Sequence, residues 1–262
     1  SIHRTPITLA APELGTDLEE LRKAVDDEET WKQEFLALFI DGSNVLLPYD
    51  VIGRCESLEA GLSILPEEMR NRTFFAGIDF GSVSDPTVLW LLELVGDVLW
   101  TRAVICRRNE NTVDQFEFLW PWIERCRFVC IDATGPGTGF GDMVAKRLPW
   151  CRSTEARVGG ERAELCSFSA PFKADIFPKL RNAFDGMRVR VPIDVDCRED
   201  LHEMQVVVGG QQFSYVAKRT QEGHSDRCTA LALALRAARN GGDMLPPMVG
   251  GKGRAFDARR IR

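Results

Sequence analysis

The sequence predicts an α/β protein whose central sheet is mixed, that is, built from both parallel and antiparallel strands. Three apolar runs follow one another directly from residue 73, so these strands are expected to form an antiparallel meander. Farther along, amphipathic segments alternate with short apolar runs, which is typical of parallel strands joined by helices. Hydrophobic residues make up 44% of the 262 residues and charged residues 27%. These proportions are ordinary for a globular chain.

Residues 1–70 predict a helical lead-in to the sheet. Amphipathic helices are expected near residues 16–23 and 27–39, and a short third helix at 48–57. No Gly-x-x-x-x-Gly-Lys sequence occurs anywhere in the chain, so the lead-in is not expected to be a P-loop ATPase.

Residues 71–242 are expected to form the sheet domain, and residues 243–262 a flexible basic tail. Strands are predicted at 73–80, 87–95, 97–107, 127–132, 151–157 and 187–191. A hairpin is predicted from 203–208 and 212–218. Helices are predicted at 112–125, 140–148, 172–185 and 225–240. Loops are predicted at 135–139 and in the acidic stretch 194–200. The order of a meander, a helix and a parallel fourth strand is that of the ribonuclease H-like fold.

Three aspartates lie at the ends of predicted elements. Asp79 and Asp132 each follow a short apolar run, so their carboxylates emerge where a buried strand ends. Asp226 opens the last helix, which is rich in alanine and leucine. Carboxylates that reach one edge of a sheet from separate parts of the chain can hold divalent metals. The sequence therefore predicts a metal-dependent nuclease site at Asp79, Asp132 and Asp226.

Each aspartate also has a simpler explanation when it is taken alone. Asp79 and Asp132 can be turn residues, and Asp226 can cap its helix together with Ser225. The occurrence of all three in this order within an α/β pattern favours the site. Hydrolysis with two metal ions needs carboxylates that bridge cations roughly 3.5–4 Å apart, and Asp79 is the expected bridging ligand.

Auxiliary roles are expected for Asp85, His224 and Lys173. Asp85 could orient a ligand or a metal-bound water. His224 could bind a metal or position a phosphate, although a histidine in a turn beside a helix cap is an equally good interpretation. Lys173 lies on a predicted helix from which its amino group could reach the scissile phosphate, and a solvated helix face is the alternative.

The formal net charge of −6 is unusual for an enzyme that binds nucleic acid. Two basic pairs, Arg107 with Arg108 and Lys218 with Arg219, are candidate contacts to the DNA backbone. Bound cations would offset part of the negative charge. The remainder predicts modest intrinsic affinity for DNA, with further affinity supplied by a partner or by a missing domain.

Other sequence signals indicate a reduced intracellular setting. The eight cysteines include no Cys-x-x-Cys pair, and Cys106, Cys130 and Cys228 lie in apolar patterns where a thiol acts as a small hydrophobic group. No run approaches the roughly 18 apolar residues of a membrane span. The first residues lack the layout of a signal peptide.

The chain resembles the C-terminal nuclease region of the large terminase subunit of tailed bacteriophages, with the Mu-like phages as one candidate group. The matching pieces are Gly77–Gly81 with Asp85, Ile131–Gly135, and Gly223–Asp226 before an alanine-rich helix. Residues 28–35 also look like the linker that follows the packaging ATPase. His224 lies two residues before its aspartate rather than three as in some relatives, which leaves its role open.

The resemblance implies an endonuclease that cuts concatemeric double-stranded viral DNA when packaging starts and ends. In that family three acids bind two Mg²⁺ or Mn²⁺ ions, and they correspond to Asp79, Asp132 and Asp226, with Asp85 as an auxiliary acid. The implied partners are double-stranded DNA, an ATPase domain of the same polypeptide, the portal and the small terminase subunit. No membrane is implied. The implied location is the host cytoplasm, with transient docking on the procapsid.

Two other functions fit parts of the sequence. Residues 78–82 and 132–137 resemble the phosphate loops of actin-like or sugar-kinase-like ATP-binding proteins, but roughly 190 residues after Thr73 leave little room for their two lobes. A non-catalytic module that docks on the portal or the motor is the second alternative, and the presence of three candidate ligands argues against it.

Overall fold

The structure is a computed structural model that describes residues 45–81, 85–155, 158–209, 212–217 and 225–241. The helices expected within residues 1–44 and the basic tail 243–262 lie outside these ranges, as do His224, Lys218 and Arg219. The compact unit that contains the sheet begins at Val45. The division of the chain at residues 70 and 242 stays a prediction.

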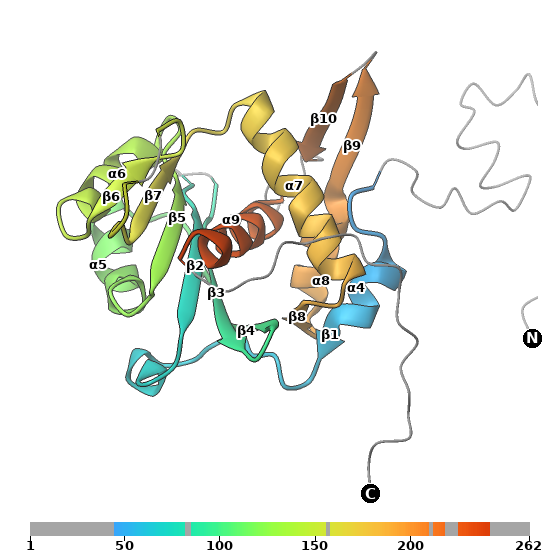
Figure 1. Ribbon diagram of the computed structural model, residues 1–262, viewed down its shortest axis with the longest axis horizontal. Helices are drawn as coiled ribbons and strands as arrows, with labels where there is room; N and C mark the ends of the chain where they lie inside the picture. The colour runs from blue at the N-terminus through green and yellow to red at the C-terminus, as the bar shows by residue number, and fades with distance from the viewer. Residues whose placement is uncertain (1–44, 82–84, 156–157, 210–211, 218–224, 242–262) are drawn as a thin grey trace, which may run out of the picture. The chain divides into compact units, whose positions relative to one another are not determined.

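An eight-stranded mixed sheet forms the centre of the described structure (Figure 1). Its strand order is β1-β8-β4-β3-β2-β5-β7-β6. Among these strands, β3 alone runs antiparallel to its neighbours. The carboxyl ends of all the others therefore meet at one edge. The strands are β1 (Glu56–Ser57), β2 (Phe74–Asp79), β3 (Thr87–Val95), β4 (Val98–Arg107), β5 (Phe128–Asp132), β6 (Trp150–Arg152), β7 (Ala163–Cys166) and β8 (Val189–Pro192).

Helices cover both faces of the sheet. The helices are α4 (Tyr49–Cys55), α5 (Thr112–Ile123), α6 (Gly137–Ala145), α7 (Ala170–Asp185), α8 (Val195–Glu203) and α9 (Asp226–Gly241), with a 3₁₀ turn η2 at Pro66–Met69. On one face, side chains of α4, α7, α8 and α9 share a core with Phe75 and Trp90 of the sheet. On the other face, α5 and α6 share a core with Ile78 and Leu89. Burial on both faces explains why the central strands read as continuous apolar runs.

The predicted meander and the parallel fourth strand are confirmed, and with them the ribonuclease H-like fold. Strands β2, β3 and β4 pair antiparallel in sequence order, with Gly96 at a positive φ of 65° in the turn between β3 and β4. Strand β5 then pairs parallel with β2. The predicted hairpin is present as β9 (Met204–Gly209) and β10 (Gln212–Ala217), which pair antiparallel outside the main sheet. The hairpin lies beside α7, where the rings of Phe177 and Tyr215 are 5.1 Å apart.

Three local predictions were wrong. The acidic stretch 194–200 is not a loop but the first part of α8, because Asp194 caps the helix by accepting a hydrogen bond from the N–H of Cys197 at 2.9 Å. The loop predicted at 135–139 ends early, since α6 already begins at Gly137. The strand near 151–157 is the short β6, and the buried four-residue strand β7 was not predicted at all.

All eight cysteines are free thiols, and seven of them are buried, as expected for small hydrophobic groups. Cys106 is exposed, because the end of β4 extends beyond the core. None of the described helices combines the length and the apolar character that a membrane-spanning helix needs.

Candidate metal centre

Asp79 and Asp132 lie side by side at the carboxyl edge of the sheet. They end the neighbouring parallel strands β2 and β5, in which the preceding residues, Ile78 and Ile131, are paired partners. Adjacent strands are roughly 4.8 Å apart, so the register alone places the two carboxylates next to each other. Both side chains are partly exposed at the end of a buried strand.

Asp226 reaches the same place from helix α9, which packs directly on β2. A Cβ atom added at Gly77 would lie 2.0 Å from the carbonyl oxygen of Ala230 and 2.2 Å from the nitrogen of Ala234. Only glycine permits this close approach of the helix to the strand. Two residues after Gly77, Asp79 lines the same pocket as Thr229, which lies one turn into α9. The first residue of α9 is Asp226.

The amino end of α9 is capped by a residue from another helix. Asp200 of α8 accepts hydrogen bonds from the backbone N–H of Cys228 at 2.8 Å and of Arg227 at 3.2 Å. Ser225, the expected cap, has a positive φ of 58°, and its buried hydroxyl has no hydrogen-bond partner among the described residues. Asp226 is therefore not needed to cap these N–H groups. The interpretation that Asp226 is only a helix cap loses its basis.

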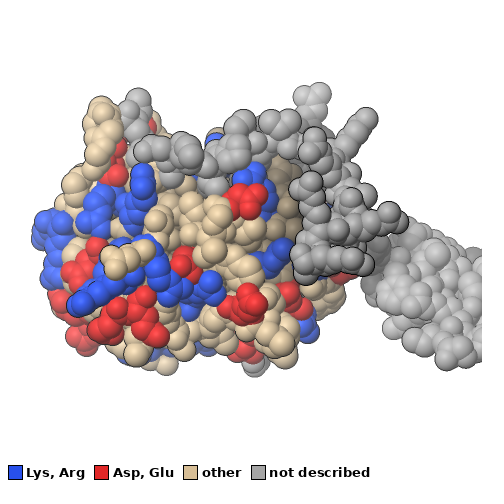
Figure 2. Space-filling view, turned by 60° about the horizontal axis from the view of Figure 1, so that its bottom comes forward, with Lys and Arg blue, Asp and Glu red and all other residues tan. Residues whose placement is uncertain are grey.

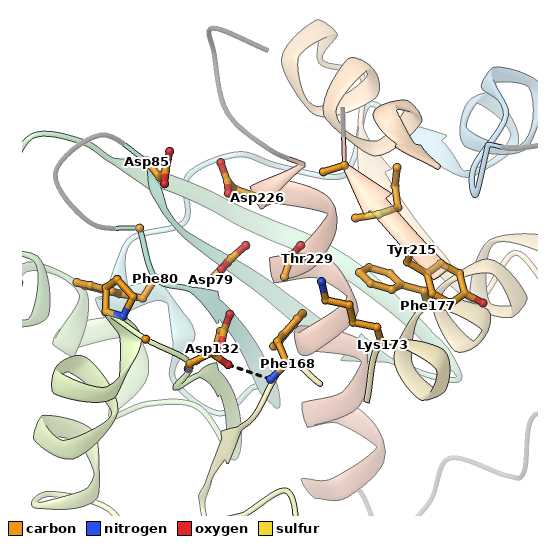
Figure 3. Close-up of a pocket in the computed structure, with 16 residues that line it drawn as sticks. Asp79, Phe80, Asp85, Asp132, Phe168, Lys173, Phe177, Tyr215, Asp226 and Thr229 are labelled. Atoms are coloured by element: carbon orange, nitrogen blue, oxygen red, sulfur yellow. Dashed lines mark hydrogen bonds between the residues drawn. The ribbon is translucent and has the colours of Figure 1, made fainter. Parts of the chain in front are cut away.

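One pocket of about 410 Å³ collects the candidate residues (Figure 3). Asp79, Asp132 and Asp226 project into it from β2, β5 and α9, and Asp85 and Lys173 line it as well. The structure thus brings together every predicted site residue that it describes, apart from the DNA-binding pair. The remaining lining is Phe80, Gly81, Thr134, Gly135, Pro136, Phe168, Phe177, Met204, Tyr215, Ala217 and Thr229.

The electrostatics of the pocket indicate a shortage of positive charge. Burial raises the pKa of Asp79 well above its ordinary value, and repulsion from the carboxylates of Asp226 and Asp132 raises it further. Burial also raises the pKa of Asp132, against the opposing effects of hydrogen bonds from Thr134 and the charge of Lys173. Among the described lining residues, Lys173 is the one cationic side chain beside four aspartates.

The residues present fit a divalent metal ion. Carboxylate oxygens are hard ligands of the kind that Mg²⁺ and Mn²⁺ prefer. A cation placed among Asp79, Asp132 and Asp226 would remove the repulsion that raises the pKa of Asp79. The Thr134 backbone N–H donates to Asp132 Oδ1 at 2.8 Å. This bond orients the carboxylate of Asp132, as residues around metal ligands commonly do.

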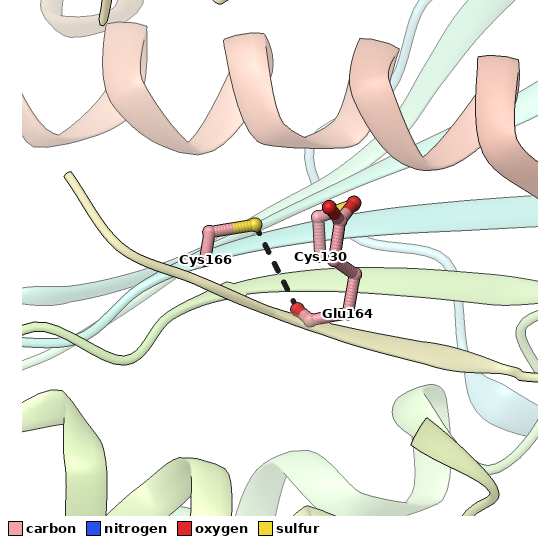
Figure 4. A group of neighbouring side chains, drawn as sticks. All are labelled: Cys130, Glu164 and Cys166. Carbon is pink, nitrogen blue, oxygen red and sulfur yellow. Dashed lines mark hydrogen bonds between the residues drawn. The ribbon is translucent and has the colours of Figure 1, made fainter. Parts of the chain in front are cut away.

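A second cluster with ligand-type side chains lies beneath α9 and does not suit a metal. Cys130, Glu164 and Cys166 are buried together on β5 and β7 (Figure 4). Arg236 donates to both carboxylate oxygens of Glu164, at 2.7 and 2.9 Å, and Asn240 donates to it at 2.7 Å. Burial raises the pKa of the Cys130 thiol. A guanidinium already neutralises this carboxylate, so the cluster is an internal ion pair.

The candidate DNA contacts Arg107 and Arg108 lie at the same edge of the sheet as the acids, because β4 ends there. Arg107 forms an ion pair with Glu110 and stacks over the ring of Phe118 at 4.0 Å. Their role in binding DNA stays a prediction. On the face shown in Figure 2, basic side chains gather with acidic ones among them. The formal charge of −6 lies entirely in residues 1–44, which hold ten acidic and four basic residues.

Sequence reasoning missed two residues that support the candidate metal centre: Asp200, which caps α9, and Thr229, which lines the pocket. Asp200 was assigned to an acidic loop, although buried Cys197 and Leu201 already show helical spacing around it. Thr229 follows Asp226 by three residues, so a helix that starts at 226 places both side chains on one face.

Comparison with known proteins identifies the family. The sequence profile of the Terminase RNaseH-like domain matches residues 76–238. The large terminase nuclease of thermophilic phage G20c with bound magnesium is 17% identical, with a TM-score of 0.56 over 74% of this chain and 97% of that one. The nuclease domain of Thermus phage P74-26 is 17% identical, with a TM-score of 0.51 over 71% and 92%. No curated protein sequence matches the chain.

The chain belongs to the terminase RNaseH-like domain family and has the fold of a large terminase nuclease domain. A longer large terminase from another thermophilic bacteriophage, in complex with ATP-γ-S, is 11% identical, with a TM-score of 0.52. The match covers 86% of this chain but 53% of that longer protein, so the chain spans about half of that terminase. The relation to Mu-like phages in particular stays a prediction.

Proposed function

We propose that this domain is the endonuclease of a viral packaging terminase and hydrolyses phosphodiester bonds of concatemeric double-stranded DNA. The observation that supports this most directly is the convergence of Asp79, Asp132 and Asp226 from three elements in one pocket. The family match supports the same activity. Structures of the G20c terminase nuclease with magnesium and with cobalt agree with a metal-dependent reaction.

Asp79, Asp132 and Asp226 would hold two Mg²⁺ or Mn²⁺ ions. When bound, such ions activate a water molecule and stabilise the charge on the phosphate and the leaving oxygen. The protein itself fixes two of the ligands: Thr134 orients Asp132, and Asp200 holds the amino end of α9, from which Asp226 projects. Lys173, close enough to lower the pKa of Asp132, supplies positive charge to the DNA phosphate. The products would carry a 3′-hydroxyl and a 5′-phosphate.

The partners follow from the same assignment. The domain would act on double-stranded DNA, next to a packaging ATPase domain of the same polypeptide, with the portal and the small terminase subunit as further partners. The longer phage terminase, whose structure contains ATP-γ-S, supports an ATPase-bearing polypeptide. The place of action would be the host cytoplasm, on the procapsid. The actin-like alternative loses its support, since the family match accounts for both of its supposed phosphate loops.

Plasmid cleavage by the purified chain tests this function. Cutting is expected with Mn²⁺ or Mg²⁺, and none with EDTA or with the Asp79→Asn variant. Asp97→Asn is the matched control, because Asp97 is exposed in the turn between β3 and β4, at the opposite edge of the sheet. No cutting by the unmodified chain, with or without a supplied ATPase domain, would favour the non-catalytic docking module instead.

A further inference from the structure

The amino edge of the sheet, opposite the aspartates, carries arginines. Arg127 and Arg162 directly precede β5 and β7, and Arg72 lies two residues before β2. These three strands are parallel neighbours. Their carboxyl ends place Asp79 and Asp132 at one edge of the sheet, and their amino ends therefore place the arginines together at the opposite edge. Together with Arg125 they line a second pocket of about 550 Å³.

The second pocket is strongly basic in a chain that is acidic as a whole. Among the described residues, four arginines and one acid, Glu161, line it. The carboxylate of Glu161 accepts hydrogen bonds from the backbone N–H groups of Val158 at 2.8 Å and Gly159 at 3.0 Å. Arg72 also pairs with Glu93 and Arg125 with Glu124, so the positive charge of the pocket exceeds the negative charge by less than its lining alone suggests.

Two of the arginines are fixed in place by bonds that use only part of their donors. Arg162 Nη2 donates to the carbonyl oxygens of Glu124 at 2.7 Å and Cys126 at 2.6 Å. Arg125 Nη1 donates to the carbonyl oxygen of Pro121 at 2.7 Å and to Glu124. A guanidinium has five N–H donors. Within the described chain, the Nε and the second Nη group of both residues make no hydrogen bond.

Capping of helix ends explains only part of this arrangement. Helices α5 and α9 both end at the pocket, and cations near a helix carboxyl end are favourable. Arg162 and Arg125 bind carbonyls of the α5 end, and Arg127 donates to the carbonyl of Gly241 at the end of α9. These bonds account for the positions of the guanidinium groups. Arg125 and Arg162, which both line the cavity, keep N–H donors that no acceptor among the described residues uses.

We propose that this pocket is a binding site for a phosphate-bearing anion, separate from the metal centre. The planar fork of arginine matches phosphate oxygens and binds them through charge-assisted hydrogen bonds. The pocket volume lies within the roughly 300–1,000 Å³ that is usual for small ligands. The six residues of β2 separate it from Asp79 by roughly 20 Å. The phosphate comes either from a free nucleotide or polyphosphate, or from a nucleic-acid strand.

The test is calorimetric titration of the full chain with inorganic tripolyphosphate in EDTA, so that no metal ion at the aspartates contributes. Saturable binding is expected, and Arg125→Gln and Arg162→Gln are each expected to weaken it about tenfold by removing charge-assisted bonds. Asp79→Asn is expected to leave it unchanged. Arg152→Gln is the matched control, since Arg152 is an exposed arginine on the neighbouring strand β6.

Melting temperatures without ligand identify any variant that is merely destabilised. If Arg162→Gln lowers that temperature, Arg125→Gln still tests the site, because Arg125 is anchored only within the end of α5. If a short DNA duplex displaces tripolyphosphate, the phosphate recognised by the pocket belongs to nucleic acid. If the duplex does not displace it, the natural ligand is a free nucleotide or polyphosphate. Absent binding, or equal weakening by Arg152→Gln, would overturn the proposal. So would binding of hexaglutamate in place of tripolyphosphate, which would identify a docking surface for an acidic peptide.

Discussion

The carboxylate of Asp200 accepts a hydrogen bond from the backbone N–H of Cys228 at 2.8 Å, so a residue of α8 caps helix α9. The capped helix carries Asp226 at its first position and Thr229 one turn later. A contact between two helices thus determines where Asp226, one candidate ligand of the proposed metal centre, lies. Asp200 and Cys228 are far apart in the sequence, so the sequence alone does not indicate that the position of Asp226 depends on Asp200.

Asp200→Ala is expected to destabilise the protein by about 1 kcal/mol, because two N–H groups at the start of α9 lose their acceptor. Urea unfolding at neutral pH measures the change. Asp196→Ala, one turn earlier on α8 with a side chain that is 70% exposed, is the control and is expected to change stability by less than about 0.5 kcal/mol. Equal stabilities of the two variants would refute the capping role.

Gly77→Ala is expected to cost about 3 kcal/mol or more and to abolish cutting, because the new methyl group would lie 2.0 Å from the carbonyl oxygen of Ala230. Helix α9 would have to move away from β2 and carry Asp226 with it. Gly139→Ala in α6 is the matched control, since no atom lies within 4 Å of its added Cβ. That variant is expected to be neutral or slightly stabilised. Thermal unfolding and plasmid cleavage report both effects, and an active, stable Gly77→Ala protein would contradict this packing.

Asp79→Asn is expected to raise the melting temperature of the metal-free protein by a few degrees, on the order of 1 kcal/mol for a chain of this size. Burial and the nearby charges of Asp226 and Asp132 disfavour the ionised form of Asp79, and an amide removes that cost. Differential scanning calorimetry in EDTA measures the shift. A lower melting temperature than that of the unmodified chain would show that the carboxylates do not repel one another.

The metal-free protein is expected to gain stability as the pH falls from about 7 to 5. The pKa of Asp200 is raised to about 6 in the folded protein, and that of Asp79 is also raised. The folded state therefore binds protons at pH values where the unfolded chain has released them, so stability is lost as pH rises through about 6. Urea midpoints in EDTA test this. In the double variant Asp79→Asn, Asp200→Asn, stability should depend less on pH. If its pH dependence is unchanged, other titratable groups cause the effect.

Arg236→Met is expected to destabilise the protein by about 3–5 kcal/mol, because it leaves the buried carboxylate of Glu164 without its counter-charge. Adding Glu164→Gln should restore part of that loss. Arg239→Met, at an exposed position in the last turn of α9, is the control and should have little effect. No recovery in the double variant would show that Arg236 acts through packing over Phe172, its neighbour at 4.8 Å, rather than through the ion pair.

Most of the sheet and the three candidate metal ligands could be predicted from the sequence, because each depends on local signals. Apolar runs mark β2 and β5, and an aspartate directly after each run must emerge at the sheet edge. Asp200 could not be assigned in this way, since its function depends on which helix packs beside α8. Strand β7 was missed because Glu164 interrupts its four residues, so no apolar run marks it. The arginines of the second pocket become neighbours only through the parallel register of three strands.

Binding of Mn²⁺ to the three aspartates is the central claim, and electron paramagnetic resonance of free Mn²⁺ tests it directly. The unmodified chain is expected to remove free Mn²⁺ from solution in proportion to its concentration. Asp79→Asn and Asp132→Asn should lose most of that binding, and Asp97→Asn should keep it. Mn²⁺ binding that survives equally in all three variants would contradict the assignment of these carboxylates as the metal ligands.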